Sequence, residues 1–261
     1  MNLSSFDLGI LLPALAAGLL VTATHVPLGM QVLARGIVFI DLAVAQIAGV
    51  GVILADVLGW EPHGAAVQVA AFSAALAGAL LLTWTERRWP EVQEATIGVV
   101  FVLGSSAAIL LLASNPQGGE HLKELLSGQI LWVGWERILA DAGLYAVMFA
   151  LWYALRERAG RVGFYVLFAC VVTVSVQLVG LYLVFATLVV PALATYYSRA
   201  RRMLKALGVG VLGYVAGLAA SALTDLPSGA MIVCAMAASG ALLALLLGKR
   251  SGIIEADGAA S

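Results

Sequence analysis

Long apolar segments recur along this 261-residue chain. A helix needs about 20 apolar residues to cross the roughly 30 Å hydrocarbon core of a membrane. Because such segments recur along the sequence, a single N-terminal signal peptide does not account for them. The sequence therefore predicts an all-α, polytopic integral membrane helical bundle. Its expected spans lie near Leu8–Met30, Ile37–Leu58, Ala65–Trp84, Ala95–Ala113, Ile138–Leu155, Phe164–Tyr197, Ala206–Leu223 and Met231–Leu247.

The composition excludes several other classes of protein. Apolar residues make up 62% of the chain, charged residues only 11%, and the mean hydropathy is +1.01. A soluble domain carries about 25% charged residues, which help to cover its surface. A soluble enzyme and a disordered chain are thus excluded, and the net charge of −1 excludes a nucleic-acid-binding protein. Cys170 and Cys234 lie within apolar runs, so neither a disulfide framework nor a thiolate zinc site is expected.

The segment Phe164–Tyr197 is too long for one crossing and short for two. As one straight helix it would extend roughly 50 Å, so we predict short or broken helices that turn near Gly180. Arginine or lysine residues flank both ends of this segment, and such residues mark cytoplasmic loops. Both flanks then face the cytoplasm, which predicts a tight helical hairpin that crosses twice. The bundle is expected to have about eight or nine transmembrane helices.

The other charged residues agree with one orientation, in which the N-terminus is outside and the C-terminus inside. The segments Glu61–His63 and Asp225–Ser228 would lie outside, and an amphipathic segment over residues 121–132 is expected to lie at the outer interface. Residues 1–250 should form one membrane domain, and residues 251–261 a disordered cytoplasmic tail. The other basic residues predicted to lie inside are Arg35, Arg87, Arg88, Lys249 and Arg250.

The chain carries no motif for an energy source of its own. A phosphate-binding loop of the form Gly-x4-Gly-Lys-Ser/Thr is absent from the sequence, and Gly248-Lys249-Arg250 is only a basic cluster. No predicted span holds the run of carboxylates and histidines expected of a proton relay. We therefore expect no enzyme but a transport subunit that takes its energy from another chain. The 28 glycines fit dense helix packing in any bundle, or helices that slide in a transporter.

Several motifs resemble those of one transport family in their order and spacing. The longest is Val179–Val184 followed by Ala186–Thr195, with Pro191 inside it. These stretches together resemble the permease subunit of the metal-ion ABC importers, which take up zinc, manganese or iron in bacteria. The other matching stretches are Pro27–Asp41, Ala95–Phe101, Leu126–Leu131, Gly217-Leu218 and Asp225–Ala230.

The resemblance implies a homodimeric, all-helical permease in the bacterial inner membrane, surrounded by lipid. Its partners would be two ABC ATPase subunits, which bind the ATP, and a periplasmic or surface metal-binding protein. The chain itself would bind no cofactor, and a divalent metal would be its substrate. The family usually has Gly-Asp-Ala-x-Ser-His in the second span. Here the stretch Ile40–Gln46 has Gln46 in place of the histidine and Asp41 one position earlier.

Polar residues inside the predicted spans are the candidate site. An ionised carboxylate such as Asp41 persists in a span mainly where a partner, water or a cation compensates it. Asp41 could equally cap its helix or reach Arg35, and His25 could simply bond a carbonyl group. If the turn between the first two spans is tight, His25, Asp41 and Gln46 come within reach of one another. Imidazole, carboxylate and amide oxygen together suit manganese, iron or zinc.

Three further residues are expected to line the pathway, namely Asp56 at the outer end of the second span, and Thr173 and Gln177 just before Gly180. Asp56 could equally be solvated, and Thr173 and Gln177 could only form interhelical hydrogen bonds. The functional interpretation is a polar lining beside a helix break, where freed backbone carbonyls can bind cations.

A basic cytoplasmic stretch holds Arg199, Arg201 and Arg202, which we expect either to anchor the chain at the membrane surface or to dock the ATPase. The stretch Arg156–Gly163 is shorter than its counterpart in the family, which includes a docking helix. Three function classes stay open. The first is a metal-importing ABC permease, the second a permease of the same fold for a non-metal solute or a metal chelate, and the third a non-transporting membrane scaffold.

Overall fold

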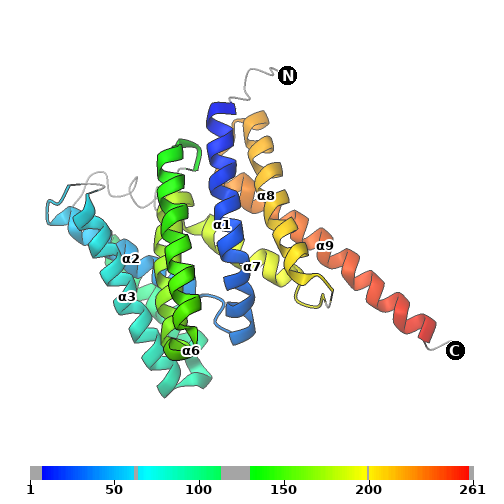
Figure 1. The fold of residues 1–261 in the computed structure, drawn as a ribbon, viewed down its shortest axis with the longest axis horizontal. Coiled ribbons are helices and arrows are strands. Elements are labelled where there is room, and N and C mark those ends of the chain that lie inside the picture. The colour runs from blue at the N-terminus through cyan, green and yellow to red at the C-terminus, as the bar shows by residue number, and fades with distance from the viewer. Residues whose placement is uncertain (1–7, 62–63, 113–129, 199, 259–261) are drawn as a thin grey trace.

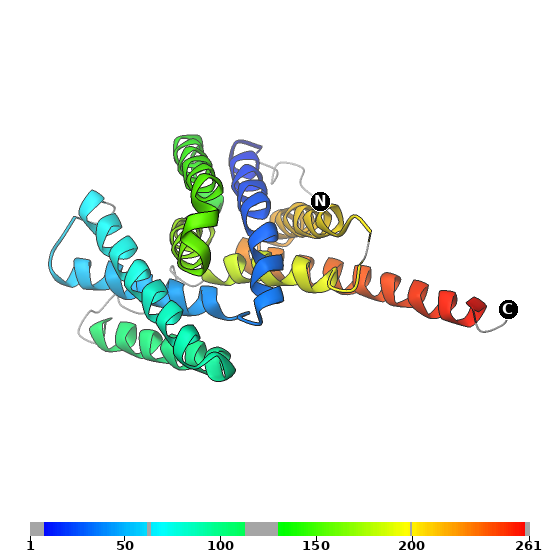
Figure 2. The same ribbon diagram turned by 60° about the horizontal axis from the view of Figure 1, so that its bottom comes forward.

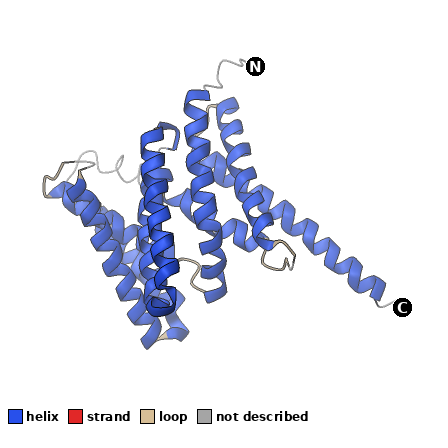
Figure 3. Cartoon of the chain, viewed as in Figure 1, coloured by secondary structure: helices blue, strands red, loops and turns tan. Residues whose placement is uncertain are grey.

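The computed structural model describes residues 8–61, 64–112, 130–198 and 200–258, and this part of the chain is helical with short connections and no strand (Figures 1 and 3). The predicted interfacial segment 121–132 lies mostly outside the described residues. The long helices are α1 (Leu8–Arg35), α2 (Ile40–Val57), α3 (Ala65–Arg88), α4 (Gln93–Leu112), α6 (Trp135–Val179), α7 (Leu181–Ala194), α8 (Arg202–Thr224) and α9 (Ser228–Gly258). Two short 3-10 helices join them, η2 (Pro90–Val92) and η3 (Ile130–Trp132).

The described helices confirm the membrane bundle. Eight helical segments are long and apolar enough to cross a membrane, and α6 supplies two of them, Trp135–Ala154 and Gly160–Val179. Helix α7 is apolar but has only 14 residues. At about 1.5 Å per residue it extends about 21 Å, which is less than the roughly 30 Å hydrocarbon core. The ninth predicted crossing therefore corresponds to a helix too short to span the membrane by itself.

Helix α6 folds back on itself at Gly160. This glycine has φ 52° and ψ −132°, a backbone conformation that glycine adopts without the steric cost that other residues meet. A hydrogen bond between the hydroxyl groups of Tyr145 and Ser175 joins the two arms. The arm before Gly160 exposes most of its surface, whereas the arm after it is among the most buried segments of the bundle. The predicted turn between two spans is thus a sharp hairpin.

The chain breaks again at Gly180, as the sequence predicts. Gly180 has φ 87° and ψ 160° and separates α6 from α7. Helix α7 then packs mainly against α1 and α9 rather than back along α6, so the tight hairpin expected over Phe164–Tyr197 does not form. The close packing of α1 and α7 has a local cause, because a Cβ atom at Gly29 would lie 1.9 Å from the Leu188 carbonyl oxygen. Only a glycine at position 29 of α1 leaves room for the backbone of α7 at Leu188.

The helices form two groups joined by α6. Helices α1, α7, α8 and α9 pack against one another, and α2, α3 and α4 form the other group. Helix α6 contacts α1 on one side and α2 and α3 on the other, and Figure 2 shows it between the two groups. The buried core is continuous across both groups. A cavity between α6 and the α2 group therefore lies near the middle of the bundle.

The ends of the helices fall on two sides of the bundle, and which side faces the cytoplasm stays a prediction. In Figure 1 the C-terminal ends of α1 and α3, the kink of α6 and the α7–α8 turn all lie toward one side. The N-terminal end of α1 and the α8–α9 turn lie toward the other. Helix α9 extends to Gly258 and so overlaps residues 251–261, for which the sequence predicts a disordered tail. The division of the chain into a membrane domain and a tail stays a prediction.

Candidate functional site

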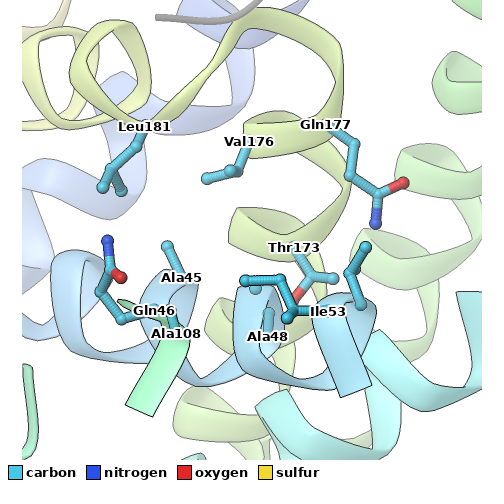
Figure 4. A pocket seen from close by; sticks show the side chains of 11 residues that line it. Ala45, Gln46, Ala48, Ile53, Ala108, Thr173, Val176, Gln177 and Leu181 are labelled. Carbon is cyan, nitrogen blue, oxygen red and sulfur yellow. The ribbon is translucent and has the colours of Figure 1, made fainter. Parts of the chain in front are cut away.

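A small cavity lies between α2, α4 and the second arm of α6, next to the break at Gly180 (Figure 4). Its polar lining residues are Gln46 from α2 and Thr173 and Gln177 from α6, and the remaining lining is aliphatic or glycine. In Figure 4 Gln46 and the two α6 residues lie on different sides of the cavity. Its volume of about 30 Å³ holds about two water molecules.

Helix α4 sets the position of Gln46. Gly104 has no side chain, and a Cβ atom there would lie 3.1 Å from the Gln46 Cβ atom. Ala108, one turn further along α4, lines the cavity. Small residues at these two positions let α4 approach α2 closely. The sequence analysis did not single out either residue, although both belong to the run of small residues Gly104–Ala108 between bulkier apolar ones.

The polar groups of the cavity are available to bind something else. Thr173 donates its hydroxyl proton to the Ala169 carbonyl oxygen at 2.7 Å, which leaves its oxygen lone pairs free. Neither the Gln46 nor the Gln177 amide forms a hydrogen bond with another described residue. Gln46 is nevertheless 91% buried, since only 9% of its surface is exposed. Gln177 is half-buried.

The helix break adds backbone groups to the same region. The Gly180 N–H donates to the Val176 carbonyl oxygen at 2.8 Å, and the Val184 N–H donates to the Gly180 carbonyl oxygen at 3.1 Å. Around these two bonds the helical pattern is interrupted, so carbonyl groups at the end of α6 and amide groups at the start of α7 lack intrahelical partners. Inside a membrane, such irregular backbone is tolerated where it is buried in protein or lines a cavity.

Asp41 is fully buried near the N-terminus of α2. Both of its carboxylate oxygens lack a hydrogen-bond partner among the described residues. It lies one turn before Ala45 and on the same face of α2, and Ala45 lines the cavity. Arg35 does not pair with Asp41, because its guanidinium group lies over the Phe164 ring at 3.8 Å. The pairing of Asp41 with Arg35 is therefore not seen, whereas its place in the first turn of α2 is one where the helix dipole favours a carboxylate.

Glu94 occupies the position that a helix cap would take. Its Oε1 atom accepts a hydrogen bond from the Phe39 N–H at 3.3 Å, and Phe39 is the residue that precedes α2. The other oxygen, Oε2, is buried and unpartnered. Carboxylates are stabilised near a helix N-terminus by the helix dipole. Glu94 therefore links α4 to α2 just before the turn that holds Asp41.

The structure does not bring His25 to this cavity. His25 is fully buried in α1, and its Nδ1–H donates to the Val21 carbonyl oxygen at 3.1 Å. Its Nε2 atom lacks a partner among the described residues. It lies on the face of α1 between Gly18, which contacts the Tyr214 ring of α8, and Gly29, which contacts α7. Asp41 and Gln46 belong to the other helix group.

The remaining candidates have separate places. Asp56 is half-buried near the end of α2 and does not line the cavity. Arg201 is exposed, whereas Arg202 is half-buried, lies 5.6 Å from the Tyr196 ring centroid and approaches the Ala192 carbonyl oxygen at 3.5 Å. Arg199 lies outside the described residues. In the part of the chain that is described, no group of three or more His, Cys, Asp or Glu residues could hold a metal ion.

A multi-pass helical bundle with a small cavity beside a broken helix is typical of membrane transport proteins. The chain belongs to the ABC 3 transport family, whose profile matches residues 7–159 and 153–248. This membership confirms the family resemblance of the sequence motifs. The chain is thus an ABC permease, and its family implies an ATPase partner and a substrate-binding protein.

Other proteins are similar over most of the chain. An uncharacterized membrane protein of Synechocystis sp. is 29% identical over an alignment of 242 residues, and the match covers 84% of this chain and 84% of that protein. The solved structure of PsaBC from Streptococcus pneumoniae in complex with Fab has a TM-score of 0.69 at 20% identity and covers 90% of each chain. A metal-chelate type ABC transporter in an inward-facing conformation has a TM-score of 0.62 at 15% identity, over 89% of this chain and 84% of that one. These two structures share the fold.

Proposed function

We propose that this chain is the membrane-spanning permease subunit of an ABC transporter that imports a divalent metal ion such as zinc, manganese or iron. The observation that carries the proposal is the cavity between α2 and α6, with unpartnered amides at Gln46 and Gln177 beside the Gly180 break. Cavities beside broken helices near the middle of a bundle are typical substrate sites in membrane transporters. The membership of the ABC 3 transport family supports the same class.

The proposed route follows α2. Gln46, Thr173 and Gln177 line its central part, Asp41 supplies a negative charge toward the cytoplasmic side, and Asp56 lies toward the outer end. A buried carboxylate without a partner is costly unless a cation or water compensates it. A divalent cation that passes along this face of α2 would provide that compensation. His25 lies in the other helix group, so we leave it out of the route.

The proposal includes the other components of the transporter. A separate ATPase would bind the ATP and dock on the cytoplasmic side at Arg201 and its neighbours, a soluble metal-binding protein would deliver the ion, and two copies of this chain would form a homodimer in the bacterial inner membrane. Support for a separate ATPase comes from the sequence, which lacks a phosphate-binding loop. The name of the metal-chelate type transporter keeps a chelate as the second candidate substrate.

The substitution Asp41→Asn tests the proposal. It removes the charge and keeps the size of the side chain, so metal uptake by cells that also carry the ATPase should be abolished. Folding and co-purification with the ATPase should be unchanged. Normal uptake by this variant would contradict the proposed route. A chain that never assembles with an ATPase would instead support the non-transporting scaffold.

A further inference from the structure

Helix α3 carries an exposed apolar face along its second half. Leu76, Leu80 and Trp84 follow one another at intervals of four residues, which makes them neighbours on one face of the helix. All three are exposed in the described part of the chain, and α3 lies at one edge of the bundle (Figure 1). Because α3 is long and apolar enough to cross a membrane, this face would lie against lipid acyl chains.

Two indole rings and two guanidinium groups follow this face at the end of α3. The rings of Trp84 and Trp89 meet edge to face with their centroids 5.3 Å apart, and the Arg88 guanidinium group lies 5.9 Å from the Trp89 ring centroid. Arg87 and Arg88 are both exposed, and neither forms an ion pair with another described residue. Trp84, Arg87, Arg88 and Trp89 together are called the basic patch.

The carboxylates around this end of α3 leave the basic patch positive. Glu86 is half-buried and pairs with Arg161, with 3.7 Å between its Oε1 atom and the Nη1 atom of the arginine. Glu91 is exposed and offsets part of the charge of Arg87 and Arg88. Two guanidinium groups against one free carboxylate give a surface that attracts anions.

Buried hydrogen bonds hold the turn after α3 in place. Gln93 donates from Nε2 to the Leu82 carbonyl oxygen at 3.0 Å, and the Thr85 hydroxyl group donates to Gln93 Oε1 at 3.0 Å. The Trp89 N–H donates to the Thr85 carbonyl oxygen at 2.7 Å. Because these bonds fix the inner side of the turn, little conformational entropy would be lost when its outer side binds a ligand.

The other described arginines on this side of the bundle differ from Arg87 and Arg88 in their surroundings. The Arg35 guanidinium group covers the Phe164 ring, Arg161 pairs with Glu86, and Arg202 contacts Tyr196 and the Ala192 carbonyl oxygen. Arg201 is exposed, but no described aromatic ring lies against it. The end of α3 thus combines free guanidinium groups, indole rings and an apolar face.

We propose that this side of α3 binds a single anionic phospholipid. An acyl chain lies along Leu76, Leu80 and Trp84, and the phosphate group meets Arg87 and Arg88. Guanidinium groups bind phosphate oxygens through paired, charge-assisted hydrogen bonds, and tryptophan side chains are enriched at the level of the head groups. The apolar face favours a lipid over the ATPase as the occupant, because a soluble protein has no access to the membrane interior below the basic patch.

Native mass spectrometry of the purified full-length chain in detergent tests the proposal. Dioleoylphosphatidylglycerol and dioleoylphosphatidylcholine carry the same acyl chains and differ in net charge, so their binding constants isolate the head group. The chain should prefer the anionic lipid. Arg87→Gln and Arg88→Gln should each weaken binding of that lipid about fivefold, the scale of one arginine near an anionic surface, and leave binding of the zwitterionic lipid unchanged. Glycerol phosphate, which lacks acyl chains, should not bind at the same concentration.

Arg201→Gln is the matched control, because it removes an exposed positive charge on the same side of the bundle where no described aromatic ring lies against it. This variant should keep the preference for the anionic lipid. Equal affinity for the two lipids, an equal loss in Arg201→Gln, or binding of glycerol phosphate as tight as that of the lipid would overturn the proposal. Unchanged lipid binding with lost ATPase co-purification in Arg87→Gln and Arg88→Gln would assign the basic patch to protein docking instead.

Discussion

The hydroxyl group of Tyr145 hydrogen-bonds to the hydroxyl group of Ser175, and the two residues lie equally far in sequence before and after Gly160. This bond shows that the two arms of α6 run back along each other over most of their length. Ser175 lies between Thr173 and Gln177 in the sequence, on the opposite face of the same arm. The first arm of α6 therefore supports the wall of the cavity from behind.

Removal of the Tyr145 hydroxyl group should loosen that support. We expect Tyr145→Phe to lower the free energy of unfolding by about 0.6 kcal/mol, the average for interhelical hydrogen bonds in membranes, and Ser175→Ala to add little in the double variant. Unfolding of the purified protein in detergent measures both. Tyr182→Phe is the control, because that side chain is 56% exposed on α7. Equal stability of Tyr145→Phe and the control would show that the bond contributes nothing.

Two glycines of α4 should respond differently to the same substitution. Gly104→Ala places a Cβ atom 3.1 Å from Gln46, so it should push α4 away from α2 and lower uptake. Gly98 has open space around it, and alanine there should keep or slightly improve stability, since alanine favours a helix over glycine by up to about 1 kcal/mol. Transport assays and thermal unfolding of both variants test this. If Gly104→Ala left uptake and thermal stability unchanged, the close packing of α4 would not determine the position of Gln46.

Substitutions of Arg201 and Arg202, between α7 and α8, should have different effects on ATPase binding and on thermal stability. Arg201 is exposed, so Arg201→Glu should weaken co-purification with the ATPase without changing thermal stability. Arg202 lies against the last turn of α7, and Arg202→Glu should lower thermal stability because it removes the contacts of the guanidinium group with the Tyr196 ring and the Ala192 carbonyl oxygen. Glu61→Gln, at an exposed position on the opposite side, should change neither. Normal assembly of Arg201→Glu would move the docking surface elsewhere.

Helix α8 offers a direct test of orientation. It runs over 23 residues, about 34 Å, so its two ends should face opposite sides of the membrane. After Cys170 and Cys234 are replaced by serine, Thr224→Cys should react with an impermeant thiol reagent added outside, and Ala200→Cys should not. Reaction at Ala200 alone would reverse the predicted topology, and reaction at both would show that α8 does not span.

Much of the architecture follows from local properties of the sequence. The spans are predicted by comparing the length of each apolar segment with the thickness of a membrane. Gly180 predicts the break in the long segment that begins at Phe164. Thr173 and Gln177 stand out for the same reason, because a polar side chain inside an apolar helix is visible without knowledge of its neighbours. Both do line the cavity.

The grouping of the helices was decided only by the tertiary structure. The first two spans are joined by a short turn, which predicts that His25 lies close to Gln46, yet α1 packs with α7 and α8 while α2 packs with α3 and α4. Hydropathy cannot distinguish these arrangements, because lipid is as apolar as a neighbouring helix and burial gives no preference between them. Close contacts at small residues select the partners instead, as at Gly29 against Leu188 and at Gly104 against Gln46.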